Sequence, residues 1–117
     1  MHANPAPALP LTEPTFYILL SLAPGKKHGY AILKDVNALS KGEITLSTST
    51  LYSALARLLD RGWIERIDDD PEQGPHPGLP RKAYTLSEVG RRILEAEIDR
   101  MQNLAAMARL RLREEGV

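Results

Sequence analysis

The sequence of 117 residues predicts a mainly α-helical fold with a small β-hairpin and one long C-terminal helix. Three observations predict it. Apolar residues recur every three or four positions in several segments, which is the spacing of amphipathic helices. Two short segments alternate between apolar and polar residues, as half-buried strands do. The last periodic segment runs from about Glu88 to Glu115, which is too long to be covered by so small a domain.

The composition limits the class of protein. Apolar residues make up 43% of the chain, enough to bury a core. Cysteine is absent, which excludes disulfides and thiolate chemistry and suits a cytoplasmic location. No apolar run approaches the roughly 18 residues that cross a bilayer, so no membrane partner is expected. The net charge is zero, so a nucleic-acid partner would require a local basic face.

Turn and cap residues place the first elements. Thr12-Glu13-Pro14 opens the first helix, because proline is tolerated in a first turn, and Pro24-Gly25 ends it. A second helix begins near Gly29. It ends at Ser40-Lys41-Gly42, where glycine suits a left-handed terminal residue. Ile44-Thr45-Leu46 is expected to form a very short strand.

The remaining elements complete a recognisable order. Ser47 is expected to cap a third helix with a leucine-rich buried face. Strands are expected at 63–67 and 81–86, and the segment 68–80 between them is a loop rich in proline and glycine. Ser87 caps the long final helix. The predicted order is that of a winged helix-turn-helix with one added C-terminal helix: helix, helix, short strand, helix, strand, loop, strand, long helix.

The predicted organisation has three parts. Residues 1–11 are rich in alanine and proline and carry no basic stretch, so we expect a disordered tail rather than a signal peptide. Residues 12–86 form the winged helix-turn-helix DNA-binding domain. Residues 87–117 form a C-terminal dimerisation helix.

The third helix is the predicted DNA-reading element. When its leucines face the core, small hydroxyl residues point outward near its N-terminal end, the part of a recognition helix that reads bases. Free N–H groups at that end also favour phosphate. The alternatives are that 47–50 only cap the helix, that the arginine is a solvated surface charge and that Tyr52 is half-buried packing with its hydroxyl in water. The predicted DNA-binding residues on this helix are Ser47, Ser49, Thr50, Tyr52, Ser53 and Arg57.

The hairpin supplies a second predicted DNA contact. Arg81 and Lys82 stand at its base, with Arg66 on the opposite strand, where basic residues can hold phosphates. Acidic residues within 68–72 would repel DNA, so they must point away or the loop must move. Lys26-Lys27, before the second helix, are further phosphate candidates or simply a solvated turn.

The final helix predicts a second copy of the chain as partner. Its apolar residues repeat at alternating spacings of four and three, which is a heptad seam, and Leu104 widens that seam. A seam inside a larger monomer is the alternative, but nothing else in the chain is available to cover it. Two recognition helices related by a two-fold axis would read a pseudo-palindromic double-stranded DNA. The predicted dimer residues are Leu94, Ile98, Met101, Leu104, Ala105, Ala108 and Leu112.

These elements together resemble the PadR family of bacterial transcriptional regulators, over about residues 13 to 110. The matching stretches include Phe16-Tyr17-Ile18-Leu19-Leu20, His28-Gly29-Tyr30-Ala31-Ile32, Leu46-Ser47-Thr48-Ser49-Thr50-Leu51-Tyr52, Gly62-Trp63-Ile64-Glu65 and Arg81-Lys82-Ala83-Tyr84-Thr85-Leu86-Ser87. The short chain with one C-terminal helix is similar to the small subfamily, in which that helix pairs two subunits.

The resemblance implies a repressor whose DNA binding is relieved by a small-molecule effector, often aromatic. Drug-binding relatives can place a tryptophan on the dimer helix, whereas here the single tryptophan, Trp63, is expected on a strand in the core. A large aromatic ligand cage is therefore not expected.

An enzyme and a protein-binding adaptor are the two other classes of function to compare with the sequence. No phosphate-binding loop, dinucleotide fingerprint or nucleophile motif is present, and the histidines His2, His28 and His76 are far apart in the chain. We therefore expect no catalytic residue, no metal site and no cofactor. A winged-helix adaptor that binds proteins and not DNA remains the alternative, and the acidic loop favours it.

Overall fold

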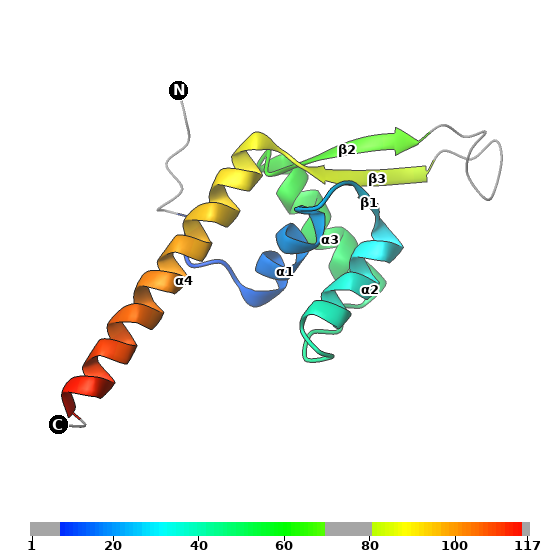
Figure 1. Cartoon of the computed structure of the whole chain (residues 1–117). Coiled ribbons are helices and arrows are strands. Elements are labelled where there is room, and N and C mark those ends of the chain that lie inside the picture. Colours follow the sequence, from blue (N-terminus) through cyan, green and yellow to red (C-terminus); the bar gives the residue numbers. More distant parts are fainter. Residues whose placement is uncertain (1–7, 70–80, 116–117) are drawn as a thin grey trace.

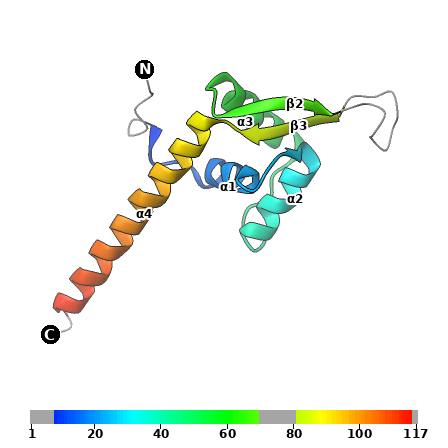
Figure 2. The same ribbon diagram turned by 45° about the horizontal axis from the view of Figure 1, so that its top comes forward.

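The computed structural model describes residues 8–69 and 81–115. Figure 1 shows the three short helices gathered on one side of a β-hairpin, with the last helix leading away from them. The turned view in Figure 2 shows the same departure. The molecule extends over 67 × 38 × 22 Å, and the long dimension follows the last helix. The elements are α1 (Glu13–Leu22), β1 (Lys27–His28), α2 (Gly29–Leu39), α3 (Thr48–Asp60), β2 (Ile64–Asp69), β3 (Arg81–Leu86) and α4 (Glu88–Glu115).

The predicted helix starts are confirmed by their caps. The hydroxyl of Thr12 accepts from the backbone N–H of Thr15 at 3.4 Å, and that of Ser47 accepts from Thr50 at 3.1 Å. The Ser87 hydroxyl accepts from the N–H of Gly90 at 3.0 Å and donates to the carbonyl of Gly62 at 2.6 Å. Each cap satisfies a backbone donor that the first turn leaves without a helical partner.

The short strand lies elsewhere than the sequence suggested. Residues 44–46 form no strand; instead β1 pairs antiparallel with β3, with Lys27 opposite Tyr84 and His28 opposite Ala83. The backbone N–H of Ile44 already donates to the Ser40 hydroxyl at 2.9 Å, so it is not available to a strand partner. The sheet order is β1-β3-β2. Strand β2 also begins and ends later than the predicted 63–67.

One core holds the domain together. Each of α1, α2, α3, β2, β3 and the first part of α4 contributes to it, and Trp63 lies in it as expected. Burial of such side chains is the main term that stabilises a domain of this size. The largest fully buried apolar side chains are Ile18, Leu19, Leu22, Ile32, Val36, Leu51, Leu55 and Ile64.

The N-terminal segment differs from its prediction. Ala8, Leu9 and Leu11 pack against the core, and the N–H of Leu11 donates to a carboxylate oxygen of Glu97 at 3.0 Å. The expected disordered tail over 1–11 is therefore wrong for residues 8–11, because their apolar side chains pack against the core. Residues 1–7 lie outside the described part of the chain.

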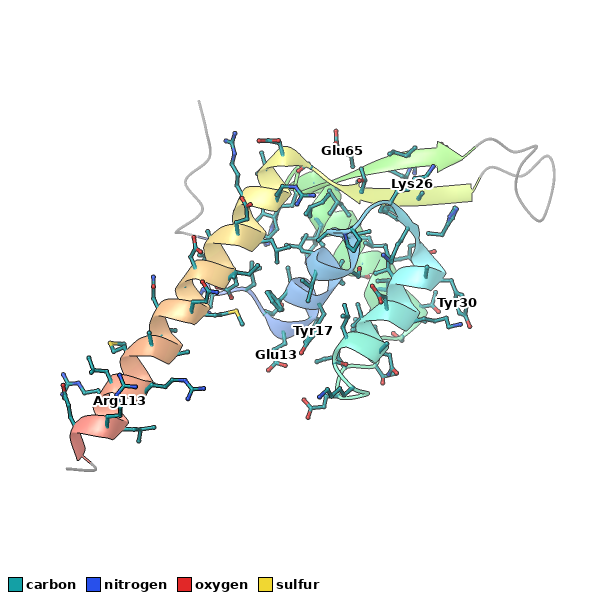
Figure 3. All side chains as sticks on the ribbon, viewed as in Figure 1. Glu13, Tyr17, Lys26, Tyr30, Glu65 and Arg113 are labelled. Atoms are coloured by element: carbon teal, nitrogen blue, oxygen red, sulfur yellow. The ribbon has the colours of Figure 1, made fainter. Side chains whose placement is uncertain are left out.

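Helix α4 has two halves with different surroundings. Its proximal half, 88–100, lies on the domain and buries Gly90, Ile93, Leu94 and Glu97. Every side chain described from Met101 to Glu114 is exposed, and Figure 3 shows the side chains of this end of the helix, where Arg113 is labelled, projecting away from the domain. None of the helices described in 8–69 and 81–115 is long and apolar enough to span a membrane.

Candidate DNA-binding surface

Helix α3 presents the outward face that the sequence predicts. Leu51, Ala54, Leu55 and Leu58 are buried. The remaining residues of its first two turns are exposed, and so is Arg57 in its last turn. A helix that buries one face and exposes small hydroxyl residues near its N-terminal end can approach the floor of a DNA groove closely. The predicted residues that share this exposed side are Ser47, Ser49, Thr50, Tyr52, Ser53 and Arg57.

The hydroxyl groups at the start of α3 bond to one another. The Ser47 hydroxyl lies 2.8 Å from that of Thr50 and 3.3 Å from that of Ser49. Capping and DNA contact are therefore compatible roles, since the cluster is capped and exposed at once. Arg57 stands apart from this cluster, at the C-terminal end of α3. That position suits a backbone phosphate beside the groove better than a base beneath the N-terminal end.

The wing carries acidic and basic residues opposite one another. Arg81 and Lys82 lie opposite Asp69 and Asp68 in the β2–β3 register, at the loop end of the hairpin and not at its base as the sequence predicted, and Lys82 is exposed. Arg66 forms an ion pair with Asp68, with 3.5 Å between Nε and Oδ1. Asp68 is thus partly compensated by neighbouring cations. The side chain of Arg81 and the acidic residues 70 and 72 lie outside the described part of the structure.

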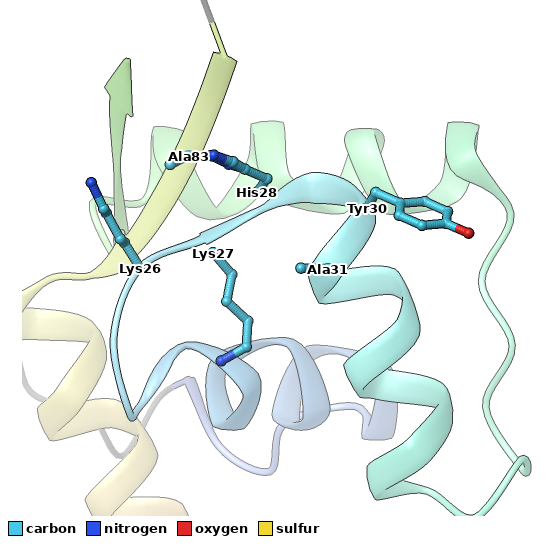
Figure 4. Close-up of a pocket in the computed structure, with 6 residues that line it drawn as sticks. All are labelled: Lys26, Lys27, His28, Tyr30, Ala31 and Ala83. Atoms are coloured by element: carbon cyan, nitrogen blue, oxygen red, sulfur yellow. The ribbon is translucent and has the colours of Figure 1, made fainter. Parts of the chain in front are cut away.

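A hollow lies between the wing and the start of α2 (Figure 4). It has a volume of about 380 Å³ and is lined by Lys26, Lys27, His28, Tyr30, Ala31 and Ala83. The two lysines point in different directions. Lys27 turns toward α1, where its ammonium group donates to the carbonyl of Ser21 at 2.8 Å and lies 3.9 Å from a carboxylate oxygen of Asp35. Lys27 is therefore held inside the domain, and the exposed Lys26 is the better phosphate candidate.

The predicted dimer residues divide between the two halves of α4. Leu94 is only 4% exposed and belongs to the core of its own domain, so it is not available to a partner as the sequence suggested. Ile98 is half-buried and packs on that core. The other predicted residues are exposed: Met101, Leu104, Ala105, Ala108 and Leu112. Leu94 is covered because the proximal half of α4 lies across α1.

Two features of the domain escaped the sequence analysis. One is the contact between Tyr52 and Gly29, which joins α3 to α2. The other is Glu97, a carboxylate 2% exposed, which accepts from Arg100 at 2.5 and 3.1 Å and from the N–H of Leu11. The signal for Glu97 was its position on the apolar face, three residues after Leu94.

No metal centre emerges from the described residues. No group of three or more histidine, cysteine, aspartate or glutamate side chains among them is placed to hold a metal ion. His2 and His76 lie outside the described ranges. The surface of this domain is therefore one of exposed hydroxyl, tyrosine and basic side chains around α3 and the wing.

Comparisons with known proteins show which family this chain is similar to. The family model for PadR-like transcriptional regulators matches residues 18–96, and no curated protein sequence matches the chain. The structure is similar to a PadR family transcription regulator from Clostridium difficile, at 25% identity and a TM-score of 0.70, covering 86% of this chain and 99% of that one. A PadR-like regulator from Bacillus cereus, 20% identical with a TM-score of 0.67, covers 84% of this chain and 89% of its own, and shares the fold.

A third relative was crystallised with DNA. Bacillus subtilis PadR in complex with operator DNA is 27% identical with a TM-score of 0.61, and the match covers 72% of this chain and 45% of that longer one. The family model covers well over half of the chain, and the winged helix-turn-helix fold agrees with it. The expectation of a regulator rather than an enzyme is confirmed by this membership. The chain belongs to the PadR-like family of DNA-binding transcriptional regulators.

Proposed function

We propose that this chain is a homodimeric repressor that reads a pseudo-palindromic double-stranded DNA and is released by a small-molecule effector. One observation carries the DNA part of the proposal: the N-terminal end of α3 exposes hydroxyl groups while its apolar face is buried in the core. The proposed contacts are Ser47, Ser49, Thr50, Tyr52, Ser53 and Arg57 on α3 and Arg81 and Lys82 on the wing. The operator complex of the Bacillus subtilis relative supports this proposal.

The exposed half of α4 supports the dimer. Met101, Leu104 and Leu112 lie on one side of a helix that extends beyond its own domain, and Leu112 is 69% exposed. Exposed apolar residues at heptad spacing are stabilised when a second helix covers them. The small side chains of Ala105 and Ala108 allow that helix to approach closely. A second copy of the chain supplies the same face, as a two-fold dimer requires.

The effector part of the proposal rests on the family and on the side chains of the free helix. Met101 and Met107 are exposed on α4, and methionine adapts readily to apolar ligands. Trp63 is buried in the core and so is not available to stack on a ligand. We therefore propose a small apolar effector bound between the two copies, in the cytoplasm, where the DNA is. A winged-helix adaptor without DNA binding is the alternative.

Binding of the purified protein to its own upstream DNA tests the DNA part. We expect a complex in a gel-shift assay whose affinity falls steeply as salt rises, because phosphate contacts release counterions. Arg57→Ala is expected to weaken specific binding roughly tenfold. Arg57→Lys keeps the charge and should retain most of the affinity if the contact is to phosphate. Unchanged binding by Arg57→Ala would remove its assigned role, and a wild-type protein that binds no DNA would favour the adaptor.

A charge placed on the free face of α4 tests the dimer. We expect Met101→Glu to give a monomer by light scattering, because each copy would have to bury a carboxylate in an apolar contact. Asn103→Glu adds the same charge on the opposite face of the same helix and should stay dimeric. A dimeric Met101→Glu protein would show that another surface holds the two copies together.

A further inference from the structure

Tyr52, on the exposed side of α3, lies against the first residue of α2. A Cβ atom built on Gly29 would lie 2.9 Å from Cζ and 3.3 Å from Cε1 of Tyr52, and closer still to its hydroxyl oxygen. Gly29 does not have the positive φ that makes glycine necessary elsewhere in the chain. A side chain at this position would require the tyrosine ring to move, because the end of the ring occupies the space of a Cβ atom. Gly29 therefore forms a seat for Tyr52.

Tyr52 also interacts electrostatically with the sheet. The pKa of the Tyr84 phenol is raised, chiefly by burial and further by its electrostatic interaction with Tyr52. Tyr84 is only 3% exposed, and it lies on the central strand, opposite Lys27 on β1 and Arg66 on β2. The packing contact of Tyr52 is with Gly29, so it joins α3 to α2.

The junction that Tyr52 occupies is not otherwise filled. A cavity of about 120 Å³ remains there, lined by Gly29, Tyr30, Leu33, Thr48, Leu51 and Tyr52. Of the buried residues of α3, only Leu51 lies near its N-terminal end, and the others lie farther along the helix. The core therefore fixes the C-terminal part of α3 more firmly than the end that faces DNA. The position of that end depends on Leu51 and Tyr52.

We propose that Tyr52 is a positioning residue whose ring, seated on Gly29, sets the angle of the N-terminal end of α3 relative to α2. Tyr52 then affects DNA binding in two ways: its exposed edge contacts the DNA, and its ring fixes the position of the helix that carries it. Gly29 is a partner in that role although it lies on another helix. The proposal rests on the proposed DNA-binding function.

A double-mutant cycle between the two helices tests the coupling. We expect Gly29→Ala to push the ring off its seat and to weaken binding to the upstream DNA roughly tenfold, by fluorescence anisotropy, with a similar loss for Tyr52→Ala. The double variant should be no weaker than the weaker single variant, because the ring that the new methyl group displaces is gone. Losses that multiply to roughly a hundredfold would mean that the two residues act independently and would overturn the proposal.

Two control variants separate positioning from stability. Gly42→Ala makes the same change at the other end of α2, where φ is +82° and no atom lies within 4 Å of the added methyl group. It should lower the melting temperature through backbone strain and leave the DNA affinity of the folded protein unchanged. Tyr52→Phe keeps the ring, so Gly29→Ala should still weaken binding in that background. An equal loss of affinity in Gly42→Ala would overturn the proposal.

A measurement without DNA tests the seat itself. In protein labelled with ¹³C at tyrosine Cζ, Gly29→Ala should shift the Tyr52 signal, and Tyr52→Ala should bring the pKa of Tyr84 down toward its ordinary value. If both signals are unaffected, the seat is wrong whatever the DNA data show. If the wild-type protein binds no upstream DNA but both signals respond, the proposed function fails and the contact stands.

Discussion

The two halves of α4 share one sequence pattern and have opposite surroundings. In the proximal half, Leu94 is buried against its own domain, whereas in the distal half Leu112, in the same heptad seam, is exposed. The N-terminal segment and α1 cover the first half, and no described residue covers the second. The pattern therefore predicts which face of a helix is apolar. What covers that face depends on how far the rest of the domain extends along the helix, and here it extends only along the proximal half.

The matched leucines give the largest test of this difference. Leu94→Ala should cost about 3 kcal/mol of unfolding free energy, because it leaves a cavity in the core. Leu112→Ala should change the stability of the isolated domain by less than about 0.5 kcal/mol, since its side chain is exposed there. Urea unfolding at two protein concentrations separates them. The loss in Leu94→Ala is expected at both, and that in Leu112→Ala only at the concentration where dimers form.

Gly90 tests how closely the proximal half approaches the rest of the domain. A Cβ there would lie 2.8 Å from the carbonyl carbon of Trp63 and closer still to its oxygen, which accepts from the N–H of Ser87 at 3.1 Å. Gly90→Ala should cost about 2 kcal/mol, because overpacking against backbone at about 3 kcal/mol exceeds a gain in helix propensity of about 1 kcal/mol. Urea unfolding measures it. A variant more stable than the parent would mean that the helix has room to move away.

Glu97 gives a smaller effect with a pH signature. Hydrogen bonds from Arg100 lower its pKa below the ordinary value of 4.5; burial acts in the opposite direction, and the N–H of Leu11 lowers the pKa further. Because the folded pKa is the lower one, the stabilisation is complete above pH 4.5 and is lost as the pH falls through the folded pKa. Glu97→Gln should cost about 1 kcal/mol at pH 7 and less in acid.

The control for Glu97 is the exposed Glu95 on the same helix. Glu95→Gln should show little change in unfolding free energy at either pH, because an exposed carboxylate is well solvated in both states. A difference between Glu97→Gln and wild type that stays constant from pH 7 to pH 3 would show that the carboxylate is not stabilised by its partners in the fold.

Much of the fold could be predicted because it depends on local rules. The caps at Thr12, Ser47 and Ser87 and the leucine periodicity of α3 act within a few residues, so the sequence alone carries them. The short strand was misplaced because a two-residue strand has no periodicity of its own. Lys27–His28 becomes a strand only because the edge of β3 lies beside it, and that edge is brought there by chain folding.

The candidate site also has features that local rules predict and features that only the tertiary structure determines. The exposed hydroxyl face of α3 follows from helical geometry once the leucines are placed inward. The seat of Tyr52 on Gly29 does not, because it depends on how two helices meet. The different positions of the Lys26 and Lys27 side chains could not be predicted either, because they depend on where chain folding places α1.

The unbroken course of α4 from domain to free end makes the chain sensitive to length as well as to composition. One residue inserted between Arg100 and Met101 would leave the domain intact and rotate everything beyond it by about 100°. The apolar stripe would then begin on the wrong side of the axis, although no apolar residue had been lost. An insertion of seven residues would restore the phase and add about 10 Å to the reach of the helix. In this part of the chain, an insertion of seven residues preserves the direction in which the apolar stripe faces, whereas an insertion of one residue changes it.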